Sequence, residues 1–121
     1  MSDHDQIRAV IQTYFDCMSE SSADKAREAF HPNARITGYL PDGLHEMSTE
    51  EFAGFVADQQ PSPSAQGQTL LAEVLSVETA GDTGVAKVRD AYLGMTFHDI
   101  LSLLKVDGRW TIYNKLFHVE A

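Results

Sequence analysis

The sequence predicts an α+β fold in which helices in the first half of the chain pack on one face of an antiparallel sheet formed by the second half. Two observations favour this arrangement. Apolar residues recur with a helical period over residues 7–18, whereas from about residue 68 onward they form extended segments separated by short turns. A chain of 121 residues with 43% hydrophobic residues is expected to form one globular domain over residues 1–121.

Three helices are expected before residue 60. The first has Asp3 as its N-cap, and its apolar face carries Ile7, Val10, Ile11, Tyr14, Phe15 and Met18. A second, shorter helix begins at about residue 21 and is ended by Pro32, because the residue before a proline disfavours the helical conformation. Ser48 and Glu51 have the spacing of a capping box, which predicts the start of a third helix.

Extended segments account for most of the remaining chain. Residues 34–40 and 44–47 are expected to form a short hairpin around the turn sequence PDG. Four longer strands are expected at about residues 69–78, 84–92, 95–106 and 109–119. The sequences between these strands, AGDTG, LG and DG, are short enough for antiparallel hairpins.

The acidic composition excludes several classes of partner. Nine Lys and Arg against eighteen Asp and Glu give a formal net charge of −9, which leaves no basic surface for nucleic acid or for an anionic membrane. No apolar run approaches the roughly 20 residues of a membrane-spanning helix, and the N-terminus MSDHDQ lacks the features of a secretion signal. The lone Cys17 excludes an internal disulfide, and a cytoplasmic protein is expected.

Motifs for metal or cofactor binding are missing from the sequence. It has no paired-Cys ligand spacing, glycine-rich phosphate loop or Gly-x-Ser-x-Gly nucleophile elbow. His31, Asp99 and His118 are a conceivable two-histidine, one-carboxylate set, but no short-spaced ligand motif supports it. We therefore expect no metal and no cofactor.

The last two strands carry the most informative pattern. Asp107-Gly108 predicts a type I′ turn, because both central residues of that turn need positive φ. Counting outward from the turn places Asp99 opposite Leu116. Since cross-strand partners share a face, one face is predicted to carry Met95, Phe97, Asp99, Leu101 and Leu103 together with Trp110, Ile112, Asn114, Leu116 and His118.

This face is the more apolar one, and it is expected to pack under the helices. It nevertheless contains the carboxylate of Asp99, whose burial is costly unless the group is hydrogen-bonded or protonated. We interpret the face as the wall of a ligand pocket. The predicted ligand-binding residues are Tyr14, Phe97, Asp99, Leu101, Trp110, Asn114 and His118. His118 is the best candidate for a general base, because imidazole changes its protonation near neutrality.

Each polar residue of this predicted site also has a structural interpretation. Tyr14 would be a core aromatic whose hydroxyl finds any available partner. Asp99 would be paired inside the core with His118 or Asn114, and His118 would be a strand-end histidine half in solvent.

Several stretches together resemble the nuclear-transport-factor-2-like (SnoaL-like) superfamily, namely VIQTYF, AFHPNARI, the capped third helix and the closing DILSLLKVDGRWTIYNKLFH. Within it, HPNA and LSLLKVDGRW…NKLFH resemble the group called putative lumazine-binding proteins. The resemblance implies a cone-shaped, strongly curved antiparallel sheet wrapped round the helices, one apolar pocket, and dimers through the outer sheet face. It implies no single function, because the superfamily hosts isomerases, dehydratases, cyclases and proteins without chemistry.

A more distant resemblance to ketosteroid isomerase implies catalytic roles. That enzyme builds its oxyanion hole from a tyrosine on the first helix and a protonated aspartic acid on a late strand, and Tyr14 and Asp99 match these positions. The aspartate that serves as its general base falls at Gly38 in this sequence. The proton-abstracting group of that family is therefore missing here.

Three functions are compatible with the sequence. The first is a pocket protein that binds a small, largely apolar or aromatic molecule. The second is a proton-transfer enzyme, an isomerase or a dehydratase-like lyase, with Tyr14, Asp99 and His118 as catalytic residues. The third is a homodimeric interaction domain without a ligand. In each case an apolar outer-face patch is expected to be buried in a two-fold homodimer, and it consists of Ile100, Leu104, Tyr113 and Phe117.

Overall fold

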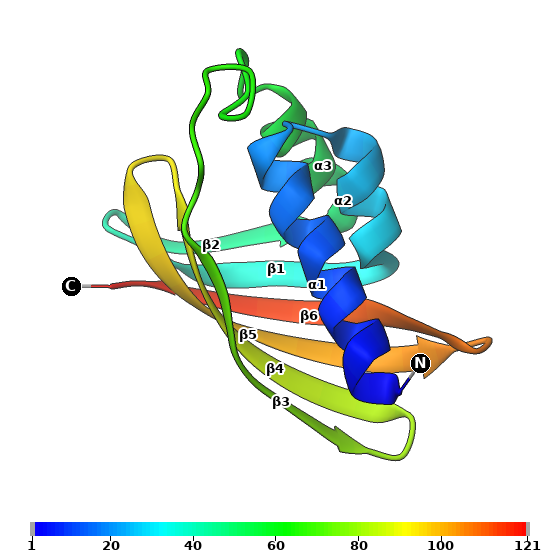
Figure 1. The fold of residues 1–121 in the computed structure, drawn as a ribbon. Helices are drawn as coiled ribbons and strands as arrows, with labels where there is room; N and C mark the ends of the chain where they lie inside the picture. Colours follow the sequence, from blue (N-terminus) through cyan, green and yellow to red (C-terminus); the bar gives the residue numbers. More distant parts are fainter. Residues whose placement is uncertain (1, 121) are drawn as a thin grey trace.

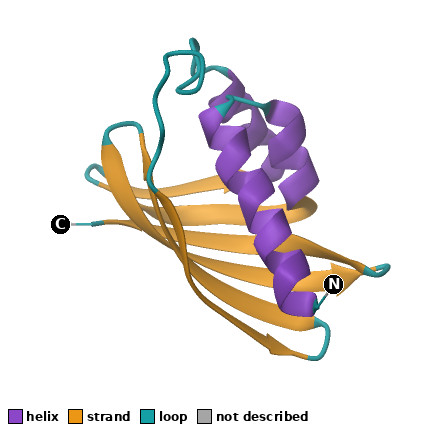
Figure 2. Ribbon diagram, in the orientation of Figure 1, coloured by secondary structure: helices purple, strands orange, loops and turns teal. Residues whose placement is uncertain are grey.

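Three helices cover one face of a curved, open six-stranded sheet in the computed structural model of the chain, which describes residues 2–120 (Figures 1 and 2). The helices are α1 (Asp3–Ser19), α2 (Ala23–Ala29) and α3 (Thr49–Ala57). The strands are β1 (Phe30–Leu40), β2 (Gly43–Ser48), β3 (Ala72–Ala80), β4 (Thr83–Tyr92), β5 (Met95–Val106) and β6 (Arg109–Val119), arranged in the order β2-β1-β6-β5-β4-β3. The predicted α+β fold is confirmed.

Local sequence explains where the helices begin. Ser48 accepts a hydrogen bond from the backbone N–H of Glu51, and the Glu51 carboxylate accepts one from the backbone N–H of Ser48, which confirms the predicted capping box of α3. The N-cap of α1 is Ser2 and not Asp3 as expected, because Asp3 lies in the first turn and its carboxylate accepts from the Trp110 indole. The predicted apolar face of α1 is confirmed by its buried residues Ile7, Ile11, Tyr14, Phe15, Cys17 and Met18.

Strand β1 runs parallel to β6, whereas the other neighbouring strands within residues 2–120 are antiparallel. This parallel pairing is not one of the hairpins expected from the sequence. The path of the chain explains it. After the β1–β2 hairpin the chain passes through α3 and residues 58–71 to the far edge of the sheet, and the β3–β6 meander then returns to β1 from that side (Figure 1).

Two-residue turns join β4 to β5 and β5 to β6. Leu93 and Gly94 have φ values of 55° and 76°, and Asp107 and Gly108 have values of 51° and 78°. Both turns thus have positive φ at both central residues, as the predicted turn at Asp107-Gly108 requires. These turns fix where the pairing of β4, β5 and β6 begins.

A β-bulge in β6 changes the predicted register of the last hairpin. Pairing follows the prediction from the turn as far as Ile112, after which Tyr113 is an extra residue. Beyond the bulge, each side chain of β6 lies on the face opposite to the one predicted. The helix side of the sheet therefore receives Lys115 and Phe117, whereas the outer face receives Asn114, Leu116 and His118.

Because of the bulge, the predicted inner face is correct for β5 and the start of β6 but wrong for the rest of β6. The predicted inward placement of Asn114, Leu116 and His118 is wrong, because counting residues from the turn does not detect the extra residue. The inward placement is confirmed for the buried residues Phe97, Asp99, Leu101, Leu103, Trp110 and Ile112.

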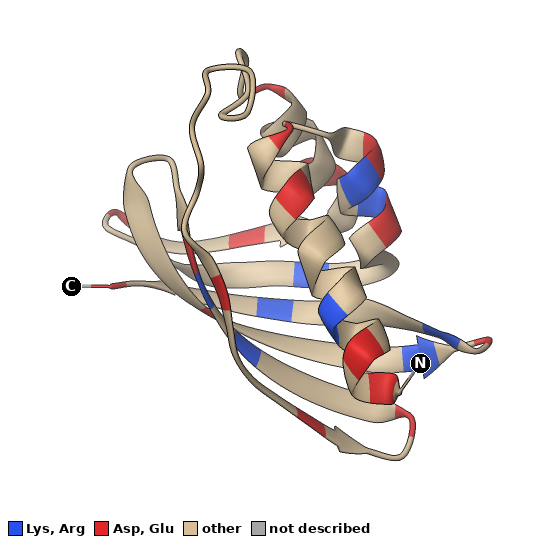
Figure 3. Ribbon diagram, viewed as in Figure 1, with Lys and Arg blue, Asp and Glu red and all other residues tan. Residues whose placement is uncertain are grey.

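Charged side chains are distributed over both layers of the molecule. Figure 3 shows Lys and Arg positions spread over α1, α2 and the sheet, with acidic positions between them. No helix within residues 2–120 is long and apolar enough to cross a membrane.

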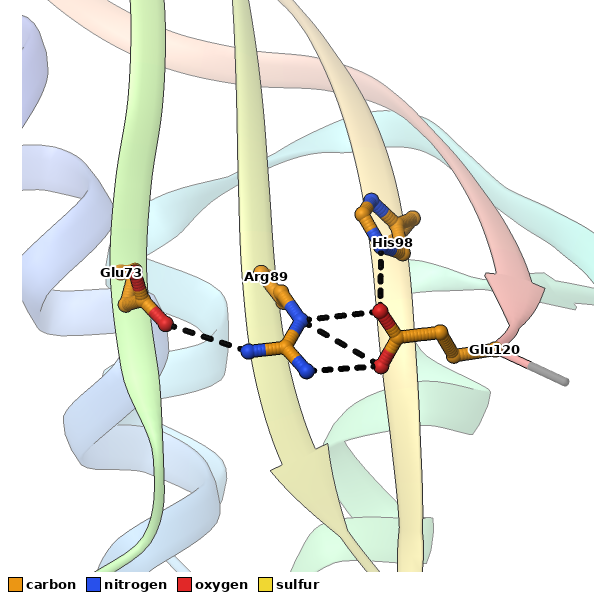
Figure 4. A network of polar contacts seen from close by, with 4 residues as sticks. All are labelled: Glu73, Arg89, His98 and Glu120. Atoms are coloured by element: carbon orange, nitrogen blue, oxygen red, sulfur yellow. Dashed lines mark hydrogen bonds and ion pairs between the residues drawn. The ribbon is translucent and has the colours of Figure 1, made fainter.

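A network of charged side chains lies on the outer face of the sheet, where β6 ends (Figure 4). The Arg89 guanidinium of β4 donates to the Glu120 carboxylate at 2.9 Å and to the Glu73 carboxylate of β3 at 3.3 Å. Nε2 of His98, on β5, lies 3.0 Å from the other oxygen of Glu120. The network therefore connects the C-terminal end of β6 to three other strands.

Candidate functional site

A pocket of about 170 Å³ lies between the helices and the sheet, at the end where the turns of the β1–β2 and β4–β5 hairpins are found (Figure 1). Its wall is mostly apolar and includes Met18, Ile36, Phe52, Phe55, Phe97 and Phe117. Four residues with polar side chains also line it, namely His45, Asp90, Tyr92 and Lys115. An engineered apolar cavity of about 150 Å³ binds benzene, so this pocket has room for a ligand with one aromatic ring.

Two buried carboxyl groups stand side by side at the wall of the pocket. Asp90 on β4 and Asp99 on β5 lie diagonally across the strand pair, because Asp99 pairs with Val88. Both residues are 1% exposed. The Tyr14 hydroxyl of α1 donates to Oδ2 of Asp99 at 2.7 Å and also lies 3.3 Å from Oδ2 of Asp90. A helix and two strands therefore converge on one polar cluster inside an apolar core.

Burial and the neighbouring Asp99 keep Asp90 protonated. Burial raises the pKa of Asp90 from 3.8 to about 9, and the neighbouring Asp99 contributes in the same direction through a hydrogen bond and its charge. Lys115 and Tyr14 act in the opposite direction but do not compensate. Asp90, which lines the pocket, therefore keeps its proton at neutral pH.

Tyr14 keeps its own proton in this environment. Its pKa is raised well above 10, first by burial and then by the negative charges of Asp90 and Asp99. The hydroxyl thus serves as a neutral donor that holds Asp99 in place.

Lys115 brings a positive charge to the same cluster. Its Nζ lies 4.0 Å from Oδ2 of Asp99, and the residue is only 6% exposed. The ammonium group also sits over the rings of Tyr14 and Phe52, at 4.7 Å and 5.0 Å from the ring centroids. Lys115 therefore forms a buried ion pair with Asp99 next to the pocket.

Two buried polar atoms have no hydrogen-bond partner among the described residues. They are Oδ1 of Asp99 and the hydroxyl of Tyr92. Unpaired polar atoms are rare in protein interiors and call for a water molecule or a ligand. The Tyr92 hydroxyl, on a pocket-lining residue, is thus an unused donor, and burial raises its pKa well above the usual value.

The structure brings some of the predicted site residues together and separates others. Tyr14 and Asp99 are joined by a hydrogen bond, and Phe97 lines the pocket. Leu101 is buried but does not line the pocket. Trp110 lies at the start of β6 and does not line the pocket, and its indole donates to Asp3 at 3.0 Å.

Asn114 and His118 lie on the outer face of the sheet, away from the pocket, because of the bulge at Tyr113. The prediction that they point into the pocket is therefore wrong. Cys17, predicted as a small core residue, is fully buried, and burial raises its pKa to about 12.

Sequence reasoning missed Asp90, Lys115 and His45. Asp90 alternates with Val88 and Tyr92 on an otherwise apolar strand face, which is the same signal that identified Asp99. Lys115 was assigned to the outer face because the bulge at Tyr113 was not predicted. Among residues 2–120, no group of three His, Cys, Asp or Glu side chains lies close enough to hold a metal ion.

Residues 2–118 match the family described as "Putative lumazine-binding". The chain belongs to this family. A curated relative is Aldolase FrzH of Cladobotryum sp. It is 29% identical over 119 residues, which cover 97% of this chain and 91% of that protein.

Solved structures show the same fold. An NTF-2-like protein of unknown function from Silicibacter pomeroyi DSS-3 superposes with a TM-score of 0.88 at 22% identity, covering 99% of this chain and 100% of the other. An NTF2-like protein of unknown function from Methylobacillus flagellatus KT gives a TM-score of 0.86 at 27% identity, with coverage of 98% and 93%. The predicted nuclear-transport-factor-2-like fold is confirmed.

Proposed function

We propose that this protein binds a small, largely apolar or aromatic carbonyl compound in the pocket and transfers a proton on it, as an isomerase or lyase of the enolate-forming type. The observation that carries the proposal is that a buried Asp90 carboxyl, whose pKa is raised to about 9, and the Lys115 ammonium both line an apolar, ring-sized pocket. The apolar wall favours ligand binding. The acid and the cation favour chemistry on an oxygen that becomes negative.

The chemistry follows from where charge develops during the reaction. Removing a proton from the carbon next to a carbonyl moves the C–H electron pair into a new C=C bond and places negative charge on the carbonyl oxygen. Asp90 would donate its proton to that oxygen in a hydrogen bond, and Lys115 would stabilise the negative charge. A carboxylic acid kept neutral at pH 7 has this role in ketosteroid isomerase.

Tyr14 and Asp99 would not contact the ligand but would position the residues that do. Their short hydrogen bond fixes the Asp99 carboxylate, and Asp99 in turn holds the proton on Asp90 and the ammonium of Lys115. This assignment keeps the two residues in the site but gives the contact with the ligand to Asp90.

The comparison with known proteins supports the same class of reaction. Aldolase FrzH is 29% identical to this chain over nearly its full length. Aldol reactions pass through an enolate or an equivalent carbon nucleophile, which needs the same stabilisation of a negative oxygen. A protein that only binds its ligand would have the same pocket, but it would not need a protonated Asp90.

The experiment uses phenylacetone as the probe, in D2O, with exchange of its α-protons followed by NMR. The native protein should accelerate exchange over buffer alone, and Asp90→Asn should lower the acceleration by about 10²–10³, the effect of losing one oxyanion donor. Lys115→Met should lower it as well. Saturation transfer from the protein to phenylacetone without accelerated exchange would instead indicate a binding protein.

A homodimer through the outer sheet face belongs to this proposal. Ile100 and Leu116 are cross-strand partners on that face and are 42% and 47% exposed. The expected patch is revised, because Phe117 points into the pocket and the Tyr113 ring packs on His31 at 4.7 Å. Exposed apolar residues at the centre of a sheet favour a two-fold interface.

A further inference from the structure

An enolate-forming reaction needs a base, and the polar residues of the pocket wall differ in their ability to act as one. Asp90 already holds a proton, and the Lys115 ammonium has no lone pair to accept another. Tyr92 carries a neutral hydroxyl. His45 is the remaining polar residue of the lining, and imidazole is the side chain best suited to accept a proton near neutral pH.

The position of His45 is set by the β1–β2 hairpin. It pairs with Gly38, which in turn pairs with Phe117 of β6, so the three residues form a row across β2, β1 and β6. A side chain at Gly38 would overlap the carbonyl oxygen of Phe117 and approach its ring to 2.5 Å. No side chain can therefore enter the pocket from the middle of this row. Its inner side is occupied by the Phe117 ring and, at the edge, by His45.

The Asp42 carboxylate forms a hydrogen bond with the imidazole of His45. Nε2 of His45 lies 2.7 Å from Oδ1 of Asp42, three residues earlier in the turn of the same hairpin. This hydrogen bond lowers the pKa of Asp42, which keeps the carboxylate negative. Nδ1 of His45 has no hydrogen-bond partner among the residues that the structure describes. A carboxylate that binds one ring nitrogen fixes the tautomer that leaves the other nitrogen as a proton acceptor.

We propose that His45 is the base of the reaction and that Asp42 is its positioning residue. Nδ1 of His45 takes the proton from the carbon next to the carbonyl group, the C–H electron pair forms the C=C bond, and the carbonyl π pair moves to the oxygen that Asp90 hydrogen-bonds. The imidazolium then returns the proton to carbon, so that no oxidant, reductant or second reactant is consumed. This assignment rests on the proposed function and specifies its substrate as a carbonyl compound whose α-carbon faces β2 while its oxygen faces β4 and β6.

The charged groups around His45 give the step a defined pH response. Asp42 faces it from the same hairpin, while Asp90 of β4, Lys115 of β6, and Phe52 and Phe55 of α3 also line the pocket. A protonated imidazole cannot accept a proton, so exchange should decline on the acidic side of the pH profile. In the variant His45→Gln this acidic decline should disappear together with most of the rate.

The test measures α-proton exchange of phenylacetone in D2O, with binding of the same probe followed by saturation-transfer NMR. We expect His45→Gln to lower exchange by at least 10²-fold, within the range for general base catalysis, while the probe's Kd stays within about threefold of the native value. Asp42→Asn should lower exchange about tenfold and move the acidic limb of the profile, as expected of a positioning residue. His98→Gln is the matched control, since His98 is a half-exposed histidine on the outer face, and it should leave exchange unchanged.

Chemical rescue separates catalysis from a structural effect. The His45 side chain is 37% exposed at the mouth of the pocket, so added imidazole should restore part of the exchange in His45→Ala and none in Asp90→Asn. Native-like exchange in His45→Gln together with its loss in Asp90→Asn would overturn this inference and leave the proposed function standing. Absence of exchange above buffer with the native protein would overturn both.

Discussion

At the scale of single residues, the pocket is a balance of charges inside an apolar core. Asp90 keeps its proton, Lys115 forms an ion pair with Asp99, and Tyr14 donates a hydrogen bond to Asp99. Breaking a buried pair by removing one partner is costly because it leaves the other charge uncompensated, whereas removing both charges is tolerated.

Lys115→Met is therefore expected to lower the free energy of unfolding by about 3–5 kcal/mol, because it breaks the buried ion pair with Asp99. Adding Asp99→Asn to this variant should restore most of the loss. Lys105→Met is the control, since Lys105 forms a partly exposed ion pair with Asp3 at 3.2 Å and should cost less than about 1 kcal/mol. Urea unfolding at pH 7 measures all three. If Lys115→Met costs no more than Lys105→Met, the buried charge balance is wrong.

Asp90 should make the stability of the protein depend on pH. Its pKa is about 9 in the folded state and near 3.8 when unfolded, so between these values the folded protein holds a proton that the unfolded chain has released. The contribution is therefore present below about pH 4 and is lost as pH rises toward 9, at up to about 1.4 kcal/mol per pH unit. The difference in unfolding free energy between native protein and Asp90→Asn at pH 5.5, 7 and 8.5 isolates this effect. Parallel pH curves for the two proteins would contradict the raised pKa of Asp90.

At the scale of elements, the fold was predictable from the sequence and half of the site was not. Helical periodicity, the capping box and the Asp107-Gly108 turn each act over a few residues, so they could be recognised locally. The same is true of Asp99, whose face follows from strand alternation. The bulge at Tyr113 has no comparable local signal, because an extra residue is needed only by the curvature of the assembled sheet. It inverted the placement of Lys115 and His118.

The network of charged side chains at the end of β6 holds this strand end against the neighbouring strands (Figure 4). Hydrogen bonds from Arg89 and His98 lower the pKa of Glu120 from 4.5 to about 2. The stabilisation by Glu120 is therefore present above about pH 4.5 and is lost as pH falls toward 2. Glu120→Gln should be less stable than the native protein at pH 6, and this difference should largely vanish at pH 2.5.

Thermal unfolding of the native protein and Glu120→Gln at the two pH values measures this effect. The control is Glu46→Gln on the edge strand β2, which should show no such convergence. A Glu120→Gln difference that is equal at pH 6 and pH 2.5 would show that the ion pairs are not the source of the stabilisation.

At the scale of the whole molecule, the two faces of the sheet have different tasks. The inner face packs on the helices and forms the pocket, while the outer face exposes Ile100 and Leu116 near its centre. The protein should therefore have the mass of a dimer in light scattering at micromolar concentration. Ile100→Glu with Leu116→Glu should convert it to a monomer by placing charges at the two-fold contact. Leu71→Glu, in the segment before β3, should leave the mass unchanged, and a native protein of monomeric mass would refute the interface.

The acidic residue of the pocket lies within a strand, whereas residues at its rim lie at the ends of hairpins. This difference affects which substitutions can change the ligand. Asp90 and Lys115 lie in paired strands whose register is fixed by tight turns and a bulge, whereas Leu40 and Leu93 line the pocket from the ends of two hairpins. Substitutions at hairpin ends reshape the opening without disturbing strand pairing. Exchange of rim residues should thus change the ligand that fits while Asp90 keeps its place in the sheet. Directed evolution toward a new substrate should accordingly accumulate changes at the rim first.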